Sequence, residues 1–374
     1  MKKLVLVFAT LVATTSLVGC NKNNSNSQRK DLVLENLGIY RDDEFGGAYI
    51  QIPIANFNDA GFKFGDSVDL TFSNDVKVED IGYYSGYYVP AGQELLVGYK
   101  GYPAIKYCIN YGEDVYTKNN FQKDTKVTIS LREEGRYKKV EETLSMSYSD
   151  DRNGYTSDEQ FANFRPISVG RMKENIIYRG ASPVDNSRKR AAIVDSLLEK
   201  NHIAYNVDLA DKEENLGQEK YQMGNYLKGL KDNNKAVFLG MAAAYKADEF
   251  SNKMKTMFEA MLANDGPYYI HCLEGKDRTG YVCMVLEALC GATYQELIDD
   301  YFVTYQNYYG IEKGSEKYEV IKELHIDEMI KYVFGFEHTV GLLGAPYHTS
   351  ATNYLLNIGL SQDQIDALQE KLSN

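Results

Sequence analysis

The chain has 374 residues, of which 44% are hydrophobic and 25% charged, and this composition excludes a largely disordered or fibrous protein. Because one hydrophobic core usually serves about 100–200 residues, we expect two domains. The formal net charge of -12 argues against a nucleic-acid partner, since general nucleic-acid binders need an excess of Lys and Arg to displace counterions. An anionic substrate therefore requires a local positive site.

The first segment, residues 1–20, has the order of a secretory signal: two lysines, an apolar run from Leu4 to Val18, and a small-residue end. The run is too short to span a bilayer comfortably. Its last letters, Leu-Val-Gly-Cys, resemble a bacterial lipobox, which implies lipidation of Cys20 and an extracytoplasmic protein anchored to a bacterial membrane. A plain signal peptide cleaved nearby, with Cys20 incidental, is the alternative. Residues 21–30 are polar and turn-prone, as a tether should be.

Short alternating apolar patterns separated by Gly, Asn and Asp run through residues 31–150. Two such runs are Val68-Leu70-Phe72 and Val127-Ile129-Leu131. A period of two with turn residues between the runs predicts a smaller, antiparallel β-rich accessory domain. The same part holds the tyrosine pairs Tyr83-Tyr84 and Tyr87-Tyr88. Tyrosine suits half-buried strand faces and also ligand-binding surfaces, so both interpretations stay open.

Residues 149–160 carry no periodic apolar pattern and predict the domain boundary. From residue 161 to residue 374, short apolar runs alternate with longer helical patterns, which predicts an α/β domain with a central, mostly parallel sheet flanked by helices. Predicted strands are 176–178, 205–209, 237–239 and 268–270. Predicted helices are 188–200, 249–263, 365–372 and one that begins with the capping-box pattern of Thr293 and Glu296.

The segment from His271 to Gly280 reads HCLEGKDRTG and lies between the predicted strand 268–270 and a helical run. A tight loop in this position directs backbone N–H groups inward, and the following helix adds its positive end, so the loop can hold a phosphoryl dianion. We call this phosphate-binding loop the phosphate cup, and the residues expected to form it are Leu273, Glu274, Gly275, Lys276 and Gly280. Gly275 relieves crowding in the turn.

Two side chains of this loop predict its chemistry. Arg278 lies six residues after Cys272, so its planar guanidinium can lie over the loop and donate to two phosphoryl oxygens. The same N–H groups and nearby cations favour the thiolate form of Cys272, which can attack phosphorus and form a phosphocysteine intermediate. An acid must protonate the leaving oxygen; Asp277 is the first candidate and Asp248, before the helix 249–263, is the alternative.

The letters CLEGKDR fit the Cys-x5-Arg motif of protein tyrosine phosphatases, and HCxxGKDRTG resembles the loop of secreted bacterial tyrosine or dual-specificity phosphatases. Residues 163–183 and 299–311 are similar to the segments that precede and follow the loop in that family. The resemblance implies a phosphatase-type α/β fold and no cofactor or metal. It also implies that His271 orients Cys272 and helps to ionise it, that Thr279 donates to the thiolate or assists phosphate departure, and that Lys276 binds additional phosphate or acidic lipid headgroups.

The sequence departs from the better-known tyrosine phosphatases in two places. It contains no Trp, so a Trp-Pro-Asp loop cannot supply the acid. In the segment VDLADKEE, Ala210 stands where relatives commonly have Arg, and this favours a structural role for Asp208. Cys283 and Cys290 are expected to pack as small hydrophobic residues. The histidines outside the loop show no metal-ligand spacing and are interpreted as structural or solvated; these are His202, His325, His338 and His348.

The sequence therefore predicts a phosphomonoester hydrolase that acts on phosphotyrosine or dual-specificity protein substrates. Hydrolysis of phosphoinositides or inositol phosphates is the alternative, because Lys276 suits a headgroup with several phosphates. A non-catalytic surface lipoprotein that only retains phosphoryl groups is a third hypothesis, in which the β-rich domain does the recognition.

Overall fold

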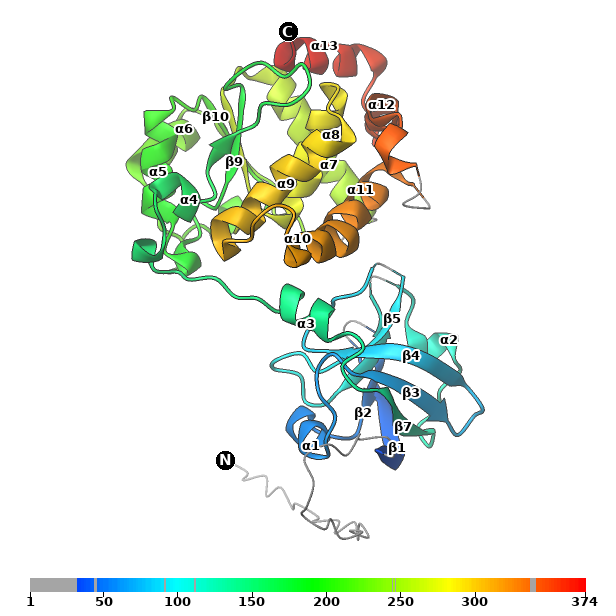
Figure 1. Cartoon of the computed structure of the whole chain (residues 1–374). Helices are drawn as coiled ribbons and strands as arrows, with labels where there is room; N and C mark the ends of the chain where they lie inside the picture. The colour runs from blue at the N-terminus through cyan, green and yellow to red at the C-terminus, as the bar shows by residue number, and fades with distance from the viewer. Residues whose placement is uncertain are drawn as a thin grey trace, which may run out of the picture.

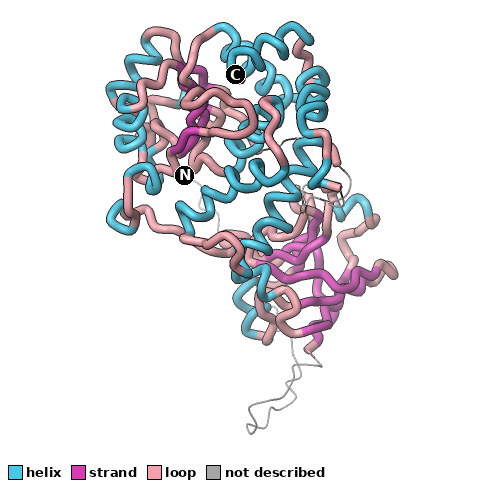
Figure 2. Tube along the Cα trace, turned by 45° about the horizontal axis from the view of Figure 1, so that its top comes forward, coloured by secondary structure: helices cyan, strands magenta, loops and turns pink. Residues whose placement is uncertain are grey.

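The computed structural model describes residues 32–43, 46–90, 92–110, 112–243, 245, 247–336 and 341–374. The predicted signal segment, the tether and Cys20 lie outside the described residues. Figure 1 shows a β-barrel and a larger α/β part, with helix α3 (Lys138–Leu144) between them. In Figure 2 the strands gather in the barrel and at the centre of the α/β part, where helices surround them.

The smaller part is a closed barrel with the strand order β1-β2-β6-β5-β4-β3-β7. Its strands are β1 (Val33–Arg41), β2 (Ala48–Ile50), β3 (Ser67–Phe72), β4 (Lys77–Tyr84), β5 (Glu94–Val97), β6 (Lys106–Ile109) and β7 (Lys126–Glu133). Two short helices, α1 (Ile54–Asp59) and α2 (Val115–Lys118), lie in its connections. The predicted antiparallel pairing holds along the barrel except between β4 and β5, which pair in parallel.

The interior of the barrel is filled by the alternating residues that the sequence pattern singled out. Val68, Leu70 and Phe72 of β3 all belong to one buried cluster, and Val127 and Ile129 of β7 join it. Because side chains of a strand alternate between its faces, these residues point inward together. The barrel thus has a hydrophobic core of its own.

The larger part contains a sheet with the strand order β11-β10-β12-β9-β8. Its strands are β8 (Arg165–Pro166), β9 (Ile177–Gly180), β10 (Tyr205–Asp208), β11 (Ala236–Phe238) and β12 (Tyr268–His271). β10 pairs in parallel with β11 and β12, and β12 pairs in parallel with β9. The short edge strand β8 is antiparallel to β9. In a parallel sheet the carboxyl ends of the strands meet at one edge, and the loop after β12 starts there.

Helices cover both faces of this sheet. The α-helices of this part are α4 (Asp158–Phe161), α5 (Ala191–Lys200), α6 (Asn225–Asp232), α7 (Asp248–Ala263), α8 (Asp277–Leu289), α9 (Tyr294–Tyr309), α10 (Glu316–Ile321), α11 (Asp327–Phe334), α12 (Tyr347–Asn357) and α13 (Gln362–Leu372). Tyr269 of β12 packs with the residues of α5 and α6, whereas its neighbours Tyr268 and Ile270 pack with those of α7 and α8. The predicted capping box at the start of α9 is present, since Thr293 and Glu296 bond reciprocally. None of the helices in the described residues is long and apolar enough to cross a membrane.

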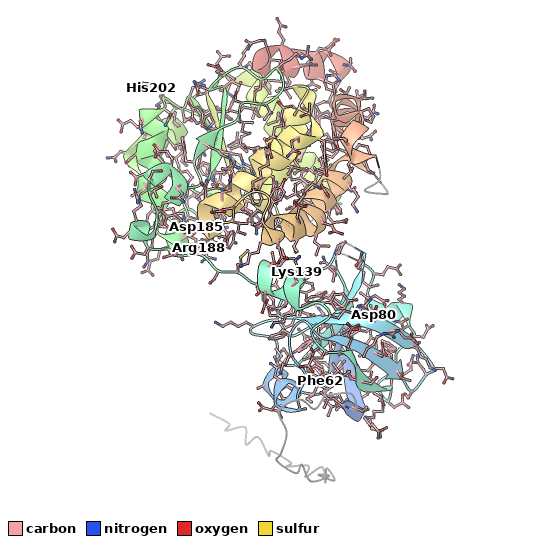
Figure 3. All side chains as sticks on the ribbon, viewed as in Figure 1. Phe62, Asp80, Lys139, Asp185, Arg188 and His202 are labelled. Atoms are coloured by element: carbon pink, nitrogen blue, oxygen red, sulfur yellow. The ribbon has the colours of Figure 1, made fainter. Side chains whose placement is uncertain are left out.

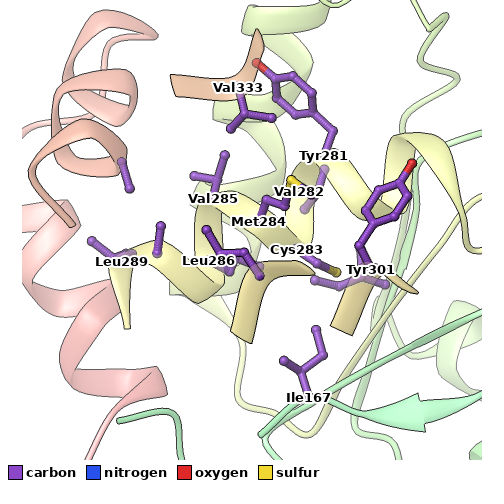
Figure 4. Packing of buried hydrophobic residues seen from close by; sticks show 14 of the residues in the cluster. Ile167, Tyr281, Val282, Cys283, Met284, Val285, Leu286, Leu289, Tyr301 and Val333 are labelled. Atoms are coloured by element: carbon purple, nitrogen blue, oxygen red, sulfur yellow. The ribbon is translucent and has the colours of Figure 1, made fainter. Parts of the chain in front are cut away.

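Helix α8 is buried along almost its whole length, from Thr279 to Leu289. Figure 4 shows Val282, Cys283 and Leu286 of this helix packed among the surrounding apolar side chains. Cys283 and Cys290 are both fully buried free thiols, which agrees with the small hydrophobic role expected of them. The helix that follows the phosphate loop is therefore held rigidly by the core.

Candidate phosphate-binding site

The loop between β12 and α8 is tied to its surroundings by its carbonyl groups. The carbonyl of Leu273 accepts from the backbone N–H of Ser182 at 3.1 Å. The carbonyl of Glu274 accepts from the Tyr308 hydroxyl at 2.8 Å and from the Asn163 side chain at 3.2 Å. With the carbonyls turned outward, the N–H groups of the loop are left to face its concave side. None of the N–H groups of residues 273–276 donates to another group in the described part of the chain.

Gly275 is required by the backbone at the tightest point of the loop. Its φ of +67° lies in the left-handed region, which L-residues with a side chain rarely adopt. A Cβ atom at this position would lie 2.2 Å from the carbonyl oxygen of Gly180 on β9. Both the conformation and the close approach to β9 therefore exclude a larger residue.

A buried guanidinium supports the loop from below. Arg179 of β9 is 1% exposed, and its Nη2 donates to the carbonyls of Gly275 at 3.1 Å and of Lys276 at 3.4 Å. Its Nη1 pairs with a carboxylate oxygen of Asp300 on α9, whose other oxygen lies 3.0 Å from Arg165. Although burial works to raise it, the two arginines hold the pKa of Asp300 below its ordinary value.

His271 lies beneath Cys272 as a neutral ring. Burial lowers its pKa to about 4 against the opposing effect of Asp211. Its Nε2 lies 3.2 Å from the Asn206 side-chain amide, and its Nδ1 lies 3.4 Å from the carbonyl of Cys272. Since an amide nitrogen only donates and a carbonyl only accepts, the proton sits on Nδ1. The expected orienting role fits this geometry, whereas a neutral ring supplies no positive charge to the sulfur.

Two buried carboxyl groups lie behind His271. Asp208, at the end of β10, accepts from the N–H groups of Ala210 and Asp211 at 2.8 and 2.9 Å. Burial raises the pKa of Asp208 and of Asp211 to about 6 in each case, and their mutual repulsion adds to the shift of Asp211. Asp208 thus closes the turn after β10, as its predicted structural role requires.

The two residues expected to carry the chemistry, Cys272 and Arg278, lie at the ends of the loop. Cys272 is a free thiol and is 4% exposed. Arg278 belongs to the first turn of α8, is half-buried, and donates from Nη1 to the carbonyl of Met241 at 2.8 Å. The segment after β11 therefore lies against the guanidinium. The hydroxyl of Thr279 is buried without a hydrogen-bond partner among the described residues.

The acid candidate Asp277 faces a group of polar side chains beside the loop. Its Oδ1 accepts from the Tyr301 hydroxyl at 3.3 Å and lies 3.9 Å from Lys276 Nζ and 3.7 Å from His325 Nε2. Although burial works to raise it, Lys276 and His325 lower the pKa of Asp277. The alternative acid Asp248 lies exposed in the first turn of α7.

The side chain of Lys276 lies against an aromatic ring. Its Nζ lies 5.3 Å from the centre of the Tyr305 ring, a distance typical of cation–π contact. Burial works to lower its pKa, but Asp277 and the neighbouring tyrosines hold it well above the ordinary value. Lys276 and Asp277 line a cavity of about 310 Å³, whereas Cys272 and Arg278 do not line it.

Sequence reasoning missed several residues of this site. His325, interpreted as structural or solvated, hydrogen-bonds Tyr305 and lies against Asp277, and burial together with Lys276 lowers its pKa to about 4. It belongs to η4 (Lys322–Ile326), a π-helical turn between α10 and α11, and such turns are frequent at functional sites. No local pattern links this histidine to a loop so far away in the sequence. The same holds for the pairing of Arg179 with Asp300.

The geometry defines an α/β domain in which Cys272 lies between the end of strand β12 and a tight loop that leads into helix α8. Residues 159–374 match the tyrosine phosphatase family, and the chain belongs to this family. It is a phosphatase of that class, and the phosphatase-type fold implied by the loop motif is confirmed. No curated protein matches the chain.

Three solved structures are similar to the chain at low identity and with low TM-scores. The core catalytic domain of the PP-IP phosphatase SIW14 from S. cerevisiae, in complex with citrate, is 22% identical, with 48% of this chain and 94% of that chain covered and a TM-score of 0.27. TpbA from P. aeruginosa is 16% identical, with 58% and 99% covered and a TM-score of 0.30. A Cys-to-Ser variant of TpbA in complex with phosphotyrosine is 14% identical, with 53% and 96% covered and a TM-score of 0.29.

Proposed function

We propose that the protein hydrolyses phosphomonoesters through a phosphocysteine intermediate on Cys272. The observation that carries this proposal is the outward anchoring of the loop carbonyls, which leaves the N–H groups of residues 273–276 around the space next to the sulfur. The start of α8 adds the positive end of a helix dipole. Backbone dipoles fixed in this way stabilise both a thiolate and a phosphoryl group in transfer.

In the first step the thiolate of Cys272 attacks phosphorus with its electron pair, and the bond between phosphorus and the leaving oxygen breaks. Arg278 holds two of the remaining phosphoryl oxygens, and Asp277 gives its proton to the leaving oxygen. In the second step water attacks the phosphocysteine, and the carboxylate of Asp277 takes the proton from that water. The S–P bond breaks, and the thiolate is restored as phosphate leaves.

Asp277 fits the second step directly, since its pKa is lowered and it is ionised in the free protein at neutral pH. For the first step it must be protonated. A phosphoryl dianion bound beside it favours the protonated form by like-charge repulsion. We propose supporting roles for His271, which orients the Cys272 peptide, and for Thr279, whose buried hydroxyl is available to the sulfur or to departing phosphate.

We propose phosphotyrosine in proteins as the substrate, with dual specificity left open, and phosphoinositides or inositol phosphates as the second candidate. Lys276 favours the second candidate because it could bind an additional phosphate group, as the loop motif implies. Turnover of phosphotyrosyl peptides and of inositol phosphates, measured side by side on the soluble chain, separates the two. A Lys276→Ala variant that retains inositol phosphate turnover would contradict the second candidate.

We also propose that the protein is exported and anchored to a bacterial membrane through a lipid on Cys20. The order of charged, apolar and small residues before Cys20 supports this proposal. Metabolic labelling with a radioactive fatty acid should mark the wild-type protein and not a Cys20→Ser variant. Label on both proteins, or on neither, would contradict the anchor.

The central test of the function is the loss of turnover in a Cys272→Ser variant. Serine lacks an ionised sulfur, so hydrolysis of p-nitrophenyl phosphate should fall by at least about 10³-fold. The matched control is Cys108→Ala, which removes a buried thiol of the barrel and should leave turnover unchanged. Turnover that survives in Cys272→Ser would exclude the proposed nucleophile.

A second test concerns the acid. Asp277→Asn should slow substrates with poor leaving groups by about 10²-fold and activated aryl phosphates much less, because only poor leaving groups need the proton. Because the pKa of Asp277 is lowered in the free protein, the decline of kcat/KM that ionisation of this acid imposes lies in the acidic range, and the variant should lose it. An equal effect on both substrate types would transfer the role to Asp248, which Asp248→Asn then tests in the same assay.

A further inference from the structure

The cavity beside the phosphate loop lies between the barrel and the phosphatase domain. On the phosphatase side it is lined by Lys276 and Asp277 of the loop and by Tyr305 and Tyr309 of α9. On the barrel side it is lined by residues 87–90, in the connection between β4 and β5. Its volume of about 310 Å³ lies at the lower end of the range of small-ligand pockets. Two separately folded parts of the chain therefore share one cavity at the edge of the proposed active site.

The barrel is fastened to this position by α3 and the segment after it. Glu141 of α3 accepts from the backbone N–H of Ser85 at 3.0 Å and so holds the β4–β5 connection. Leu144 and Met146 pack against the core of the phosphatase domain. Lys139, which Figure 3 places on α3 near the phosphatase domain, lies 4.0 Å from Glu316.

The segment after α3 also reaches the phosphate loop. Tyr148 hydrogen-bonds the carboxylate of Glu274, and its ring stacks on Tyr308 at 4.4 Å between centres. Arg188 forms an ion pair with the same carboxylate, at 3.4 Å between Nη2 and Oε1 of Glu274. Its guanidinium lies 5.1 Å from the centre of the Tyr148 ring. The linker is thus part of the support of the loop, which fixes the barrel relative to the cup.

The lining of the cavity is mainly aromatic and apolar, and its charged side chains are Lys276, Asp277 and Glu328. Tyr87 and Tyr88 face the cavity from the barrel, and Tyr87 is held by a hydrogen bond of 2.7 Å to Tyr102. Among the described lining residues, Lys276 is the only cation with a pKa above neutrality, since the pKa of His325 is lowered to about 4. Two carboxylates also line the cavity, those of Glu328 and of Asp277, which lies 3.9 Å from Lys276.

This charge distribution discriminates between ligands. A polyphosphorylated inositol carries several dianionic groups and needs several cations, whereas aromatic walls stack on a planar ring. A phosphotyrosyl residue offers one phosphate for the cup and one ring for the tyrosines. We infer that this cavity binds the aromatic ring and neighbouring apolar side chains of a phosphotyrosyl peptide, and that residues 87–90 of the barrel form one wall of the substrate site. The inference rests on the proposed function and adds the barrel to its substrate site.

The test uses the full chain with Tyr88→Ala and, as a second variant, Val89→Glu, which places a negative charge in the same wall. The matched control is Tyr40→Ala, which removes a tyrosine of β1 that does not line the cavity. We expect both wall variants to raise KM for a phosphotyrosyl peptide by about tenfold, since loss of one ring contact has about this effect. Inhibition by orthovanadate, which occupies only the phosphate cup, should change less than about twofold. The control should change neither quantity.

The outcomes separate this inference from the proposed function. If the wild type hydrolyses the peptide and both wall variants keep its KM, the barrel does not bind substrate and the inference is wrong. If the wall variants weaken turnover of an inositol phosphate and spare the peptide, the wall contacts a different class of substrate and the inference is wrong. A wild type that neither hydrolyses phosphomonoesters nor binds vanadate would instead overturn the proposed function.

Discussion

Replacing Arg179 with Met tests whether the phosphate cup depends on its buried guanidinium. The change keeps a long, unbranched side chain and removes the charge and all the donors. Arg179 pairs with Asp300 and donates to the carbonyls of Gly275 and Lys276. The variant leaves Asp300 with Arg165 at 3.0 Å as its remaining cation.

The expected magnitude follows from this environment. Removal of one partner from a buried ion pair usually costs about 3–5 kcal/mol, and the surviving contact with Arg165 favours the lower end, about 3 kcal/mol. For a domain of about 200 residues this corresponds to a decrease of about 6–12 °C in Tm. Loss of the hydrogen bond to Gly275 should weaken vanadate binding by about tenfold, the equivalent of one buried hydrogen bond.

Thermal unfolding followed by circular dichroism, and vanadate inhibition at a temperature well below Tm, measure the two effects separately. Arg132→Met is the matched control, because Arg132 pairs with two carboxylates, at 3.0 and 3.2 Å, but its side chain is 40% exposed. An exposed pair contributes only about 0–1 kcal/mol. Equal changes in Tm for both variants, or unchanged vanadate binding in Arg179→Met, would refute the proposed support of the loop.

Three further changes test other parts of the site. Asp208→Asn should stabilise the protein more at pH 8 than at pH 5, by about 1–2 kcal/mol. The pKa of Asp208 in the folded protein is about 6, which is higher than in the unfolded chain. The stability that the protonated carboxyl contributes at low pH is therefore lost as the pH rises through 6. A Tm difference from wild type that is the same at both pH values would contradict this. Tyr148→Phe keeps the stack on Tyr308 but removes the hydrogen bond to Glu274. The free energy of unfolding should fall by about 1–3 kcal/mol, which lowers Tm, and the affinity for vanadate should fall as well. Unchanged vanadate affinity would show that the linker does not support the loop. His325→Gln should shift the pH dependence of kcat/KM by altering the surroundings of Asp277, and an unchanged profile would remove the histidine from the site.

The sequence was most informative where the chemistry is local. The loop letters, the strand before them and the helix after them are contiguous, and the family match confirms the class of enzyme that they indicate. The alternation of Val68, Leu70 and Phe72 predicted their inward direction for the same reason, because a strand fixes the direction of each side chain relative to its neighbours.

The parts that sequence reasoning missed depend on contacts between distant segments. Asp300 meets Arg179 because α9 packs beside β9, and His325 meets Asp277 because a π-helical turn follows α10. No fixed spacing of residues in the sequence predicts either contact. The tyrosine pairs show the same limit: Tyr83 is fully buried in the barrel, whereas Tyr88 lines the cavity at the phosphatase domain. The sequence left both interpretations open for each pair, a half-buried strand face and a ligand-binding surface.

The most direct test of the central claim is the identification of the phosphorylated atom during turnover. The wild type is mixed with a ³²P-labelled phosphotyrosyl peptide, denatured within milliseconds and digested, and the labelled fragment is sequenced by mass spectrometry. We predict label on the sulfur of Cys272 and none in Cys272→Ser. Label on another residue, or hydrolysis by Cys272→Ser at the wild-type rate, would contradict the proposed mechanism.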